Sequence, residues 1–475
     1  MTLKPASTKT APPVHARTCG RRGVRFAGVL CVLLLLARGE PAFAVDAGFL
    51  RDFPESGEVR ALVFDEWLSE ELSRVLLLRP RTLTDRFGNS FTVRNEKSRD
   101  GAFLRIIVGP VESADALPSG RRTDGGVRGT WVLSRRISDG MPASISVYPV
   151  DNPNVVVTLV PDGASPESGR SRLSLETWGR TVRSGVPVGL PLVKLYTMDV
   201  ASVVSMTRAT VPWTALSPDP WRYVDLSRMV ETIRAEIGSL VYLEDGAFDE
   251  RGRPVYIGDG RAQREEEVLA AALGKRDVSG IAGGVNCSGF AKWIIDGMIR
   301  PVTGSGVKIA ALKGPTSFPD TRFTESYRES RDLFFALDWT RHLASAALSL
   351  ASWSTVRPDT SGVDVKLEPF SGLHGHERNV GYRVTDALPL LHWLALVEPG
   401  HFYLGAVSRE VGEPSLRTYH HVAVFMPYFD AEGRFSCVVF ENAEETSISA
   451  FTAANADAWV HLVRVRAPES GRFAP

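Results

Sequence analysis

The pattern of apolar residues changes near residue 216, and this change most constrains how the 475-residue chain can fold. Before it, short apolar runs are separated by Gly, Pro, Asn and Asp, which is typical of strands joined by turns. After it, apolar residues recur at helical spacing, first in a segment that we expect to begin at Asp225 and to end at Gly238. Leu216–Trp221 (LSPDPW) contains two prolines and predicts a linker between two parts of different class.

Residues 45–215 predict a β-rich domain of the sandwich or barrel type, because turn signals recur between short alternating runs. The expected strands are Ser90–Arg94, Phe103–Val108, Thr130–Leu133, Ser144–Val147, Val155–Leu159, Leu173–Thr177 and Leu192–Tyr196. A short amphipathic helix is expected near Asp65–Leu77. This part contains no motif with a chemical function, so we interpret it as an accessory domain.

The first 44 residues have the three-part pattern of a secretory signal peptide. Basic residues precede an apolar run of 12 residues, Phe26–Ala37, and Ala42-Phe43-Ala44 supplies a small-residue cleavage site. A helix of this length is too short to span a bilayer, and the alternative is an uncleaved N-terminal anchor. We expect an exported protein, in the periplasm or outside the cell, at or near the envelope.

Charge and cysteine content limit the function classes. Basic and acidic side chains number 55 each, so no basic field indicates a nucleic-acid partner. Cleavage after residue 44 would leave two of the four cysteines, Cys287 and Cys437. An exported protein with two cysteines has either one disulfide or at least one thiol available for chemistry.

Cys287 is predicted to stand at the first position of a helix. Asn286 before it is a good N-cap, and apolar residues follow at helical spacing: Phe290, Trp293, Ile294 and Met298. At a helix start, the dipole and the free N–H groups stabilise a thiolate. Glycines on both sides allow close backbone approach, so the Cys287 N–H is a candidate donor to an oxyanion. The alternative interpretation is a small thiol buried in a core helix.

A thiolate nucleophile needs an imidazole to hold it as an ion pair and to protonate the leaving group. His421 lies 134 residues after Cys287, within the spacing of papain-like enzymes. It opens an apolar run, Val422–Met426, which is followed by a turn and a second run, Phe435–Phe440. This pattern predicts a β-hairpin with histidine at one open end and polar residues at the other.

The register of this hairpin selects the partner of His421. With a three-residue loop, Ala423 faces Glu441, and Glu441 lies diagonally from His421 on the same face. With a four-residue loop, Asn442 faces His421 directly. Either residue would orient the imidazole through its second nitrogen, and we prefer Glu441. In both registers His420 points to the opposite face.

These residues resemble a known family. Asn286–Phe290 (NCSGF) resembles the Asp-Cys-Ser-Gly-Leu signature of NlpC-type cell-wall cysteine peptidases, which have a papain-like fold. His421–Phe425 (HVAVF) resembles their His-Val-Gly-Ile-Tyr strand, and Pro399–Tyr403 resembles the Pro-Gly-Asp strand before it. The segment from Arg234 to Tyr242 resembles their helix–Gly–Tyr segment. The resemblance covers residues 225–300 and 386–443.

The resemblance implies an α+β chain in which residues 216–475 form a papain-like hydrolase domain with an insertion at residues 300–385. It implies cleavage of an amide bond in a peptide or peptidoglycan-type substrate, without a cofactor. Cys287 would attack, His421 would move the proton, and Tyr242 would flank the oxyanion. Glu441 or Asn442 would orient His421. The chain departs from the family in having Asn286 for aspartate, the large insertion, and a third residue that is mostly histidine in the family.

Other interpretations remain open on the sequence alone. One alternative is a degenerate papain-like domain that binds at the envelope without catalysis, and another is transfer of an acyl group instead of hydrolysis. His374, His376 and Glu377 lack a further ligand at metal-binding spacing, so we expect no metal. Cys437 lies about 13 Å along a strand from Glu441. If Glu441 reaches His421 and His421 reaches Cys287, Cys437 is too far from Cys287 to form a disulfide, so we expect a free structural thiol. The apolar stretch Leu333–Trp353 contains three polar interruptions and predicts a core helix.

Overall fold

A computed structural model describes residues 48–50, 53–111, 127–163, 169–273, 280–316, 332–367, 375–413, 415–469 and 472–475. The expected signal peptide, residues 1–44, and His374 lie outside the described residues. Residues 45–475 form one compact unit. Within the described ranges, no helix combines the length and the apolar character needed to cross a bilayer.

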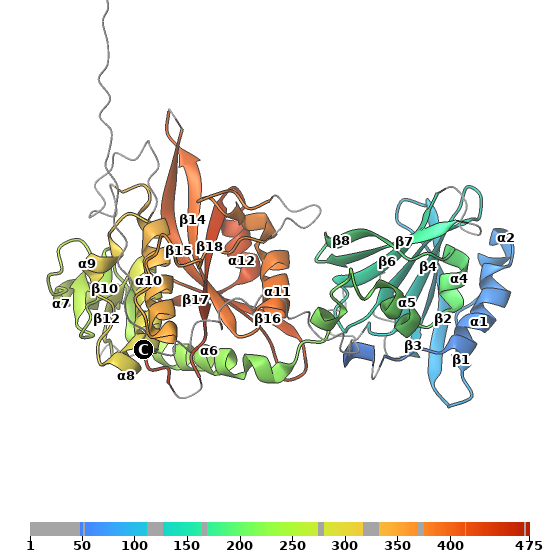
Figure 1. Ribbon diagram of the computed structural model, residues 1–475, viewed down its shortest axis with the longest axis horizontal. Coiled ribbons are helices and arrows are strands. Elements are labelled where there is room, and N and C mark those ends of the chain that lie inside the picture. Colours follow the sequence, from blue (N-terminus) through green and yellow to red (C-terminus); the bar gives the residue numbers. More distant parts are fainter. Residues whose placement is uncertain are drawn as a thin grey trace, which may run out of the picture. The chain divides into compact units, whose positions relative to one another are not determined.

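The N-terminal part is one large antiparallel sheet of eight strands in chain order (Figure 1). Its strands are β1 Arg81–Thr84, β2 Ser90–Lys97, β3 Phe103–Pro110, β4 Thr130–Arg136, β5 Pro142–Tyr148, β6 Val155–Asp162, β7 Arg170–Thr177 and β8 Arg180–Pro187. Among the described residues, β1 pairs only with β2 and β8 only with β7. The sheet is therefore neither closed nor doubled, and the sandwich or barrel expectation is wrong in this respect.

Helices complete the core of this sheet in place of a second sheet. They are α1 Gly57–Val63, α2 Leu72–Val75, α4 Leu192–Thr197 and α5 Val200–Thr207, with short turns η1 Gly48–Leu50 and η2 Phe64–Leu68. The segment Leu192–Tyr196, which we expected to be a strand, is helix α4. Leu192, Leu195 and Tyr196 are buried at helical spacing, so they meet the core on one helix face.

The C-terminal part contains an antiparallel sheet of six strands in the order β13-β18-β14-β15-β16-β17. They are β13 Tyr382–Arg383, β14 His401–Val411, β15 Leu416–Phe429, β16 Phe435–Glu441, β17 Glu444–Ser447 and β18 Trp459–Arg466. Two small sheets stand beside it. In the first, β9 Leu240–Tyr242 and β12 Gly283–Val285 are parallel, and in the second, β10 Gly246–Phe248 and β11 Pro254–Tyr256 are antiparallel.

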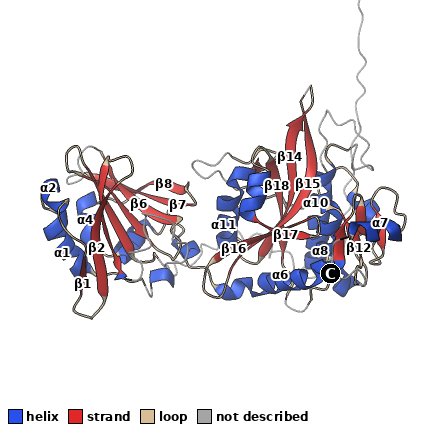
Figure 2. Ribbon diagram, turned by 180° about the vertical axis from the view of Figure 1, so that it is seen from behind, coloured by secondary structure: helices blue, strands red, loops and turns tan. Residues whose placement is uncertain are grey.

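Helices cover both faces of the six-stranded sheet (Figure 2). These helices are α6 Val224–Glu236, α8 Cys287–Thr303, α10 Phe335–Ser352, α11 Ala387–Val397 and α12 Ile448–Ala454. Helix α7 Glu265–Ala271 packs on the β9–β12 sheet and α9 Ile309–Leu312 packs on α10. The short turns are η3 Trp213–Leu216, η4 Pro220–Tyr223, η5 Ile237–Ser239 and η6 Val384–Asp386. Val422 and Val424 of β15 pack in one core with α8 and α10. Ala423 and Phe425 pack in the other core with α11. Alternation along the strand thus gives the sheet two buried faces.

The expected helices are confirmed, and the segment that we expected to be a linker forms short turns. LSPDPW contributes the end of η3 and the start of η4, which Asp219 caps. Helix α6 buries Leu226 and three further apolar residues of the expected face, although it begins at Val224, one residue before the predicted cap. The expected core helix at Leu333–Trp353 is α10, whose inner residues are buried.

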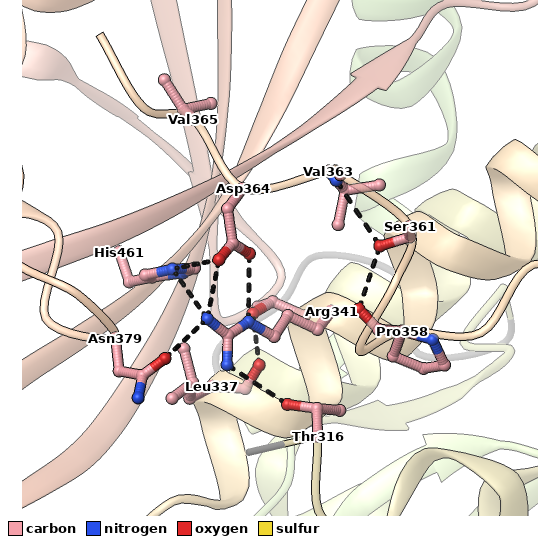
Figure 3. A network of polar contacts seen from close by, with 12 residues as sticks. Thr316, Leu337, Arg341, Pro358, Ser361, Val363, Asp364, Val365, Asn379 and His461 are labelled. Atoms are coloured by element: carbon pink, nitrogen blue, oxygen red, sulfur yellow. Dashed lines mark hydrogen bonds and ion pairs between the residues drawn. The ribbon is translucent and has the colours of Figure 1, made fainter. Parts of the chain in front are cut away.

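The described part of residues 300–385 is fastened to the sheet by a polar network (Figure 3). Arg341 of α10 makes a bidentate ion pair with Asp364 at 3.0 and 2.8 Å, and it also donates to Asn379 at 2.9 Å. His461 of β18 lies 3.5 Å from the same carboxylate. Burial would raise the pKa of Asp364, but hydrogen bonds from His461 and Arg341 outweigh burial and hold it well below its usual range.

Removing Arg341 from this network leaves the negative charge of Asp364 without its ion-pair partner and with little water to solvate it. We expect Arg341→Ala to lower the free energy of unfolding by about 3 kcal/mol. Arg357→Ala, which breaks an exposed pair with Asp359, is the control and should change it by less than about 0.5 kcal/mol. Urea unfolding of both variants measures the difference. Equal losses in the two variants would show that the network does not hold this region.

Candidate active site

The first turn of α8 presents Cys287. The side chain of Asn286 accepts a hydrogen bond from the Gly289 N–H at 2.8 Å and so caps the helix. Cys287 is the first helical residue, so no preceding helical carbonyl lies in position to accept its N–H. The residue is mostly buried, with 9% of its surface exposed. The helix start therefore offers a thiol and a backbone donor side by side.

Glycines let this turn cross a neighbouring strand closely. A Cβ atom on Gly289 would lie 2.0 Å from the carbonyl oxygen of Gly246, and one on Gly284 would lie 2.4 Å from Cβ of Leu243. Side chains at these positions would push apart the start of α8, β12 and the segment before β10. The close crossing therefore sets the position of Cys287 at the start of α8.

Gln263 clamps the same crossing, and sequence reasoning missed it. Its Nε2 donates to the carbonyls of Ala247, Val255 and Gly284 at 3.2, 3.0 and 2.7 Å. Its Oε1 accepts from the Gly284 N–H at 2.8 Å. The amide is fully engaged by backbone groups, so Gln263 supports the site and has no spare donor for a substrate. A single glutamine in a loop carries no spacing signal that would have revealed this contact.

The β15–β16 hairpin has the first of the two registers considered. The Asp430 N–H donates to the Arg434 carbonyl at 3.0 Å, and Gly433 in the three-residue loop has a φ of 76°. Val424 then pairs with Phe440, which places Glu441 diagonally from His421. Nε2 of His421 lies 2.6 Å from Oε2 of Glu441. Because a carboxylate only accepts, Nε2 carries the proton and donates it.

A β-bulge sets the direction of His421. His421 pairs with Val407, but Tyr419 pairs with Ser408, so His420 is an extra residue without a place in the β14–β15 register. Bulges of this kind re-aim a side chain and are frequent next to active sites. His420 is exposed and lies 3.0 Å from Arg409. Of the two histidines, His421 is therefore the one that lies in the candidate site.

The His421 ring is held between two acidic groups. Burial would lower its pKa, but hydrogen bonds and negative charge at Cys287 and Glu441 outweigh burial and raise the pKa to about 10. Glu441 occupies Nε2, so Nδ1 is the nitrogen left to face the thiol. This arrangement favours a protonated His421 ring between Cys287 and Glu441.

The other candidate residues lie close by in different roles. Asn442 forms the β16–β17 turn with Ala443, both at positive φ, and Glu441 is the residue that bonds His421. Tyr242 pairs with Val285 in the parallel β9–β12 ladder, two residues before Cys287, and is 54% exposed. The structure thus brings Tyr242 beside the strand that leads to the thiol.

Cys437 is a free thiol in β16, opposite Pro427, and burial raises its pKa. Cys287 is free as well. Among the described residues, no group of three His, Cys, Asp or Glu side chains is placed to hold a metal ion. The His376 ring makes an edge-to-face contact with Tyr382.

The surroundings of Cys287 are closely packed. The indole of Trp339 in α10 donates to the Ser288 carbonyl at 2.9 Å, so the insertion packs directly beside the thiol. Two surface hollows, of about 530 and 480 Å³, lie along α6 and beside α11, and neither is lined by Cys287 or His421.

Comparison with known proteins finds a match for one part of the chain. A family model described as a domain of unknown function, DUF8515, matches residues 50–215, the range of the eight-stranded sheet and its helices. No curated protein and no solved structure matches the chain. The match does not reach the part that contains Cys287 and His421.

The glycine crossing gives a testable consequence. We expect Gly289→Ala to lower the free energy of unfolding by about 1–3 kcal/mol, because the new Cβ meets a backbone oxygen that cannot turn away. It should also slow alkylation of Cys287, since the first turn of α8 must shift away from His421.

Gly238→Ala is the matched control, because a Cβ there has no atom within 4 Å. It should leave both stability and alkylation close to wild type. Urea unfolding and iodoacetamide labelling measure the two effects. If Gly289→Ala behaved like Gly238→Ala, the crossing would not position the thiol.

Proposed function

We propose that this protein is an exported bacterial cysteine hydrolase that cleaves an amide bond in a peptide, with peptidoglycan peptides as the substrate class. The observation that carries the proposal is the His421 ring, which contacts Cys287 at a helix start and Glu441 at a strand end. A thiol, an imidazole and a carboxylate in this order are the groups that nucleophilic cleavage of an amide requires.

The proposed reaction uses these groups in two steps. Sγ of Cys287 attacks the amide carbon, and the proton on Nδ1 of His421 passes to the leaving amine, so that a thioester remains. His421 then takes a proton from water as the water attacks the thioester, which releases the carboxylic acid product and the Cys287 thiolate, with the proton back on His421. The Cys287 N–H faces the developing oxyanion, and Tyr242 flanks it. Glu441 keeps the ring oriented through Nε2 in both steps.

The likeness to NlpC-type peptidases supports the substrate class. The order of a helix-start cysteine, a strand-start histidine and a polar residue on the next strand agrees with that family. We propose a papain-like arrangement for residues 216–475, with Glu441 in the place of the family's usual histidine. Residues 1–44 would direct export, and residues 45–215 would position substrate or hold the enzyme at the envelope.

A second candidate function is a binding protein in which the same groups no longer catalyse. The observation that favours it is the burial of Cys287, with Trp339 bound to the neighbouring Ser288 carbonyl. In this alternative the insertion closes the groove, and the domain recognises envelope peptides without cleaving them. The two candidates differ in whether a small electrophile reaches the thiol.

Alkylation of the mature protein with iodoacetamide from about pH 4 to about pH 9, mapped by mass spectrometry, separates the two candidates. We expect Cys287 to react fast well below the pH of an ordinary thiol, because the His421 imidazolium stabilises the thiolate. His421→Ala should abolish that acidic reactivity. Cys437 is the internal control and should stay unreactive, since burial raises its pKa.

Slow labelling of Cys287, with an ordinary profile that His421→Ala leaves unchanged, would contradict the hydrolase and favour the binding protein. Fast, His421-dependent labelling would be followed by incubation with peptidoglycan peptides. Release of a new amine by wild type and not by Cys287→Ser would then show that an amide bond is cleaved, and the masses of the products would identify it.

A further inference from the structure

The segment that supplies Glu441 stands at an edge of its sheet. Glu441 is the last residue of β16, and a two-residue turn connects it to β17, which has four residues. Both turn residues, Asn442 and Ala443, adopt left-handed backbone conformations without being glycine. Within the described sheet, β17 pairs only with β16. Short edge strands have few contacts to hold them, so β17 is held mainly by β16 and by helix α12, which follows it directly.

An ion pair adds a further attachment on the side of α6. Arg234 in the last turn of α6 and Glu445 of β17 form a bidentate pair, in which Nε donates to Oε2 and Nη2 donates to Oε1, both at 2.7 Å. Tyr428 of β15 is a further hydrogen-bonding neighbour of Arg234. Bidentate arginine–carboxylate pairs fix relative orientation as well as distance. Glu445 pairs across the ladder with Phe440, the residue before Glu441.

The helix that carries Arg234 also leads toward the thiol. After α6 the chain passes through η5 into β9, which ends at Tyr242. Strand β9 pairs in parallel with β12, and β12 runs through Asn286 into Cys287. The Arg234–Glu445 pair therefore joins the side of the site that holds the thiol to the turn that holds the carboxylate.

We propose that Arg234 and Glu445 are positioning residues, which keep Glu441 against His421 and thereby keep His421 oriented toward Cys287. This inference rests on the proposed cysteine chemistry. Both side chains are partly exposed, at 44% and 35%, so the pair adds little to overall stability. A small displacement of a catalytic group costs much more in rate, up to about 100-fold for an error near 1 Å. The expected signature is a loss of reactivity without a loss of stability.

The test compares iodoacetamide labelling of Cys287 in full-length mature variants. Arg234→Gln and Glu445→Gln should each slow labelling at acidic pH by about tenfold, within the range for misplaced groups. Glu441→Gln is measured in parallel. Each of the two variants should shift the acidic limb of the labelling-rate pH profile in the same direction as Glu441→Gln does. The reversed pair, Arg234→Glu with Glu445→Arg, should recover most of the rate, because the same bridge forms with exchanged ends.

Arg357→Gln is the matched control, because Arg357 makes a bidentate pair with Asp359 outside the β15–β16 hairpin and is 76% exposed. It should label at the wild-type rate, and the unfolding midpoint in urea should be the same in all variants. Wild-type labelling that depends on His421, combined with unchanged rates in Arg234→Gln and Glu445→Gln, would overturn this inference alone. Labelling that does not depend on His421 would instead overturn the proposed function.

Discussion

The proposed site depends on the position of the His421 imidazole between the thiol of Cys287 and the carboxylate of Glu441. Cys287 comes from a helix start and Glu441 from a strand end, and local contacts hold each of them in position. The Asn286 cap and the Gly289 crossing set the thiol. The three-residue hairpin loop sets the carboxylate, and the bulge at His420 turns His421 toward both.

The parts of this arrangement that sequence could predict are the local ones. Asn286 as a cap, the helix that follows it and the choice between two hairpin registers depend on residues within a few positions of one another. The open eight-stranded sheet and helix α4 could not be predicted in the same way. Alternation of apolar and polar residues predicts strands, but it does not show whether the strands form one sheet or two. The apolar residues of Leu192–Tyr196 fit the period of a strand as well as that of a helix.

The remaining support comes from contacts between distant residues, which leave no periodic signal in the sequence. Gln263 holds β12 through backbone carbonyls, and Arg234 reaches a glutamate 211 residues away. Arg341 and Asp364 join the described part of the insertion to β18. Helix α10 is a buried element of the core and packs beside the thiol, so this part of the insertion shapes the site from within the fold.

Direct observation of the His421 ring by NMR across pH, in wild type and in Cys287→Ala, tests the central claim most directly. Wild-type His421 is expected to stay protonated until about pH 10, because the acidic groups on both sides hold the proton. In Cys287→Ala the apparent pKa should fall, since the charge of the thiolate is lost while Glu441 remains. A ring that titrates near about 6.5 in both proteins would contradict an assembled thiol–imidazole pair.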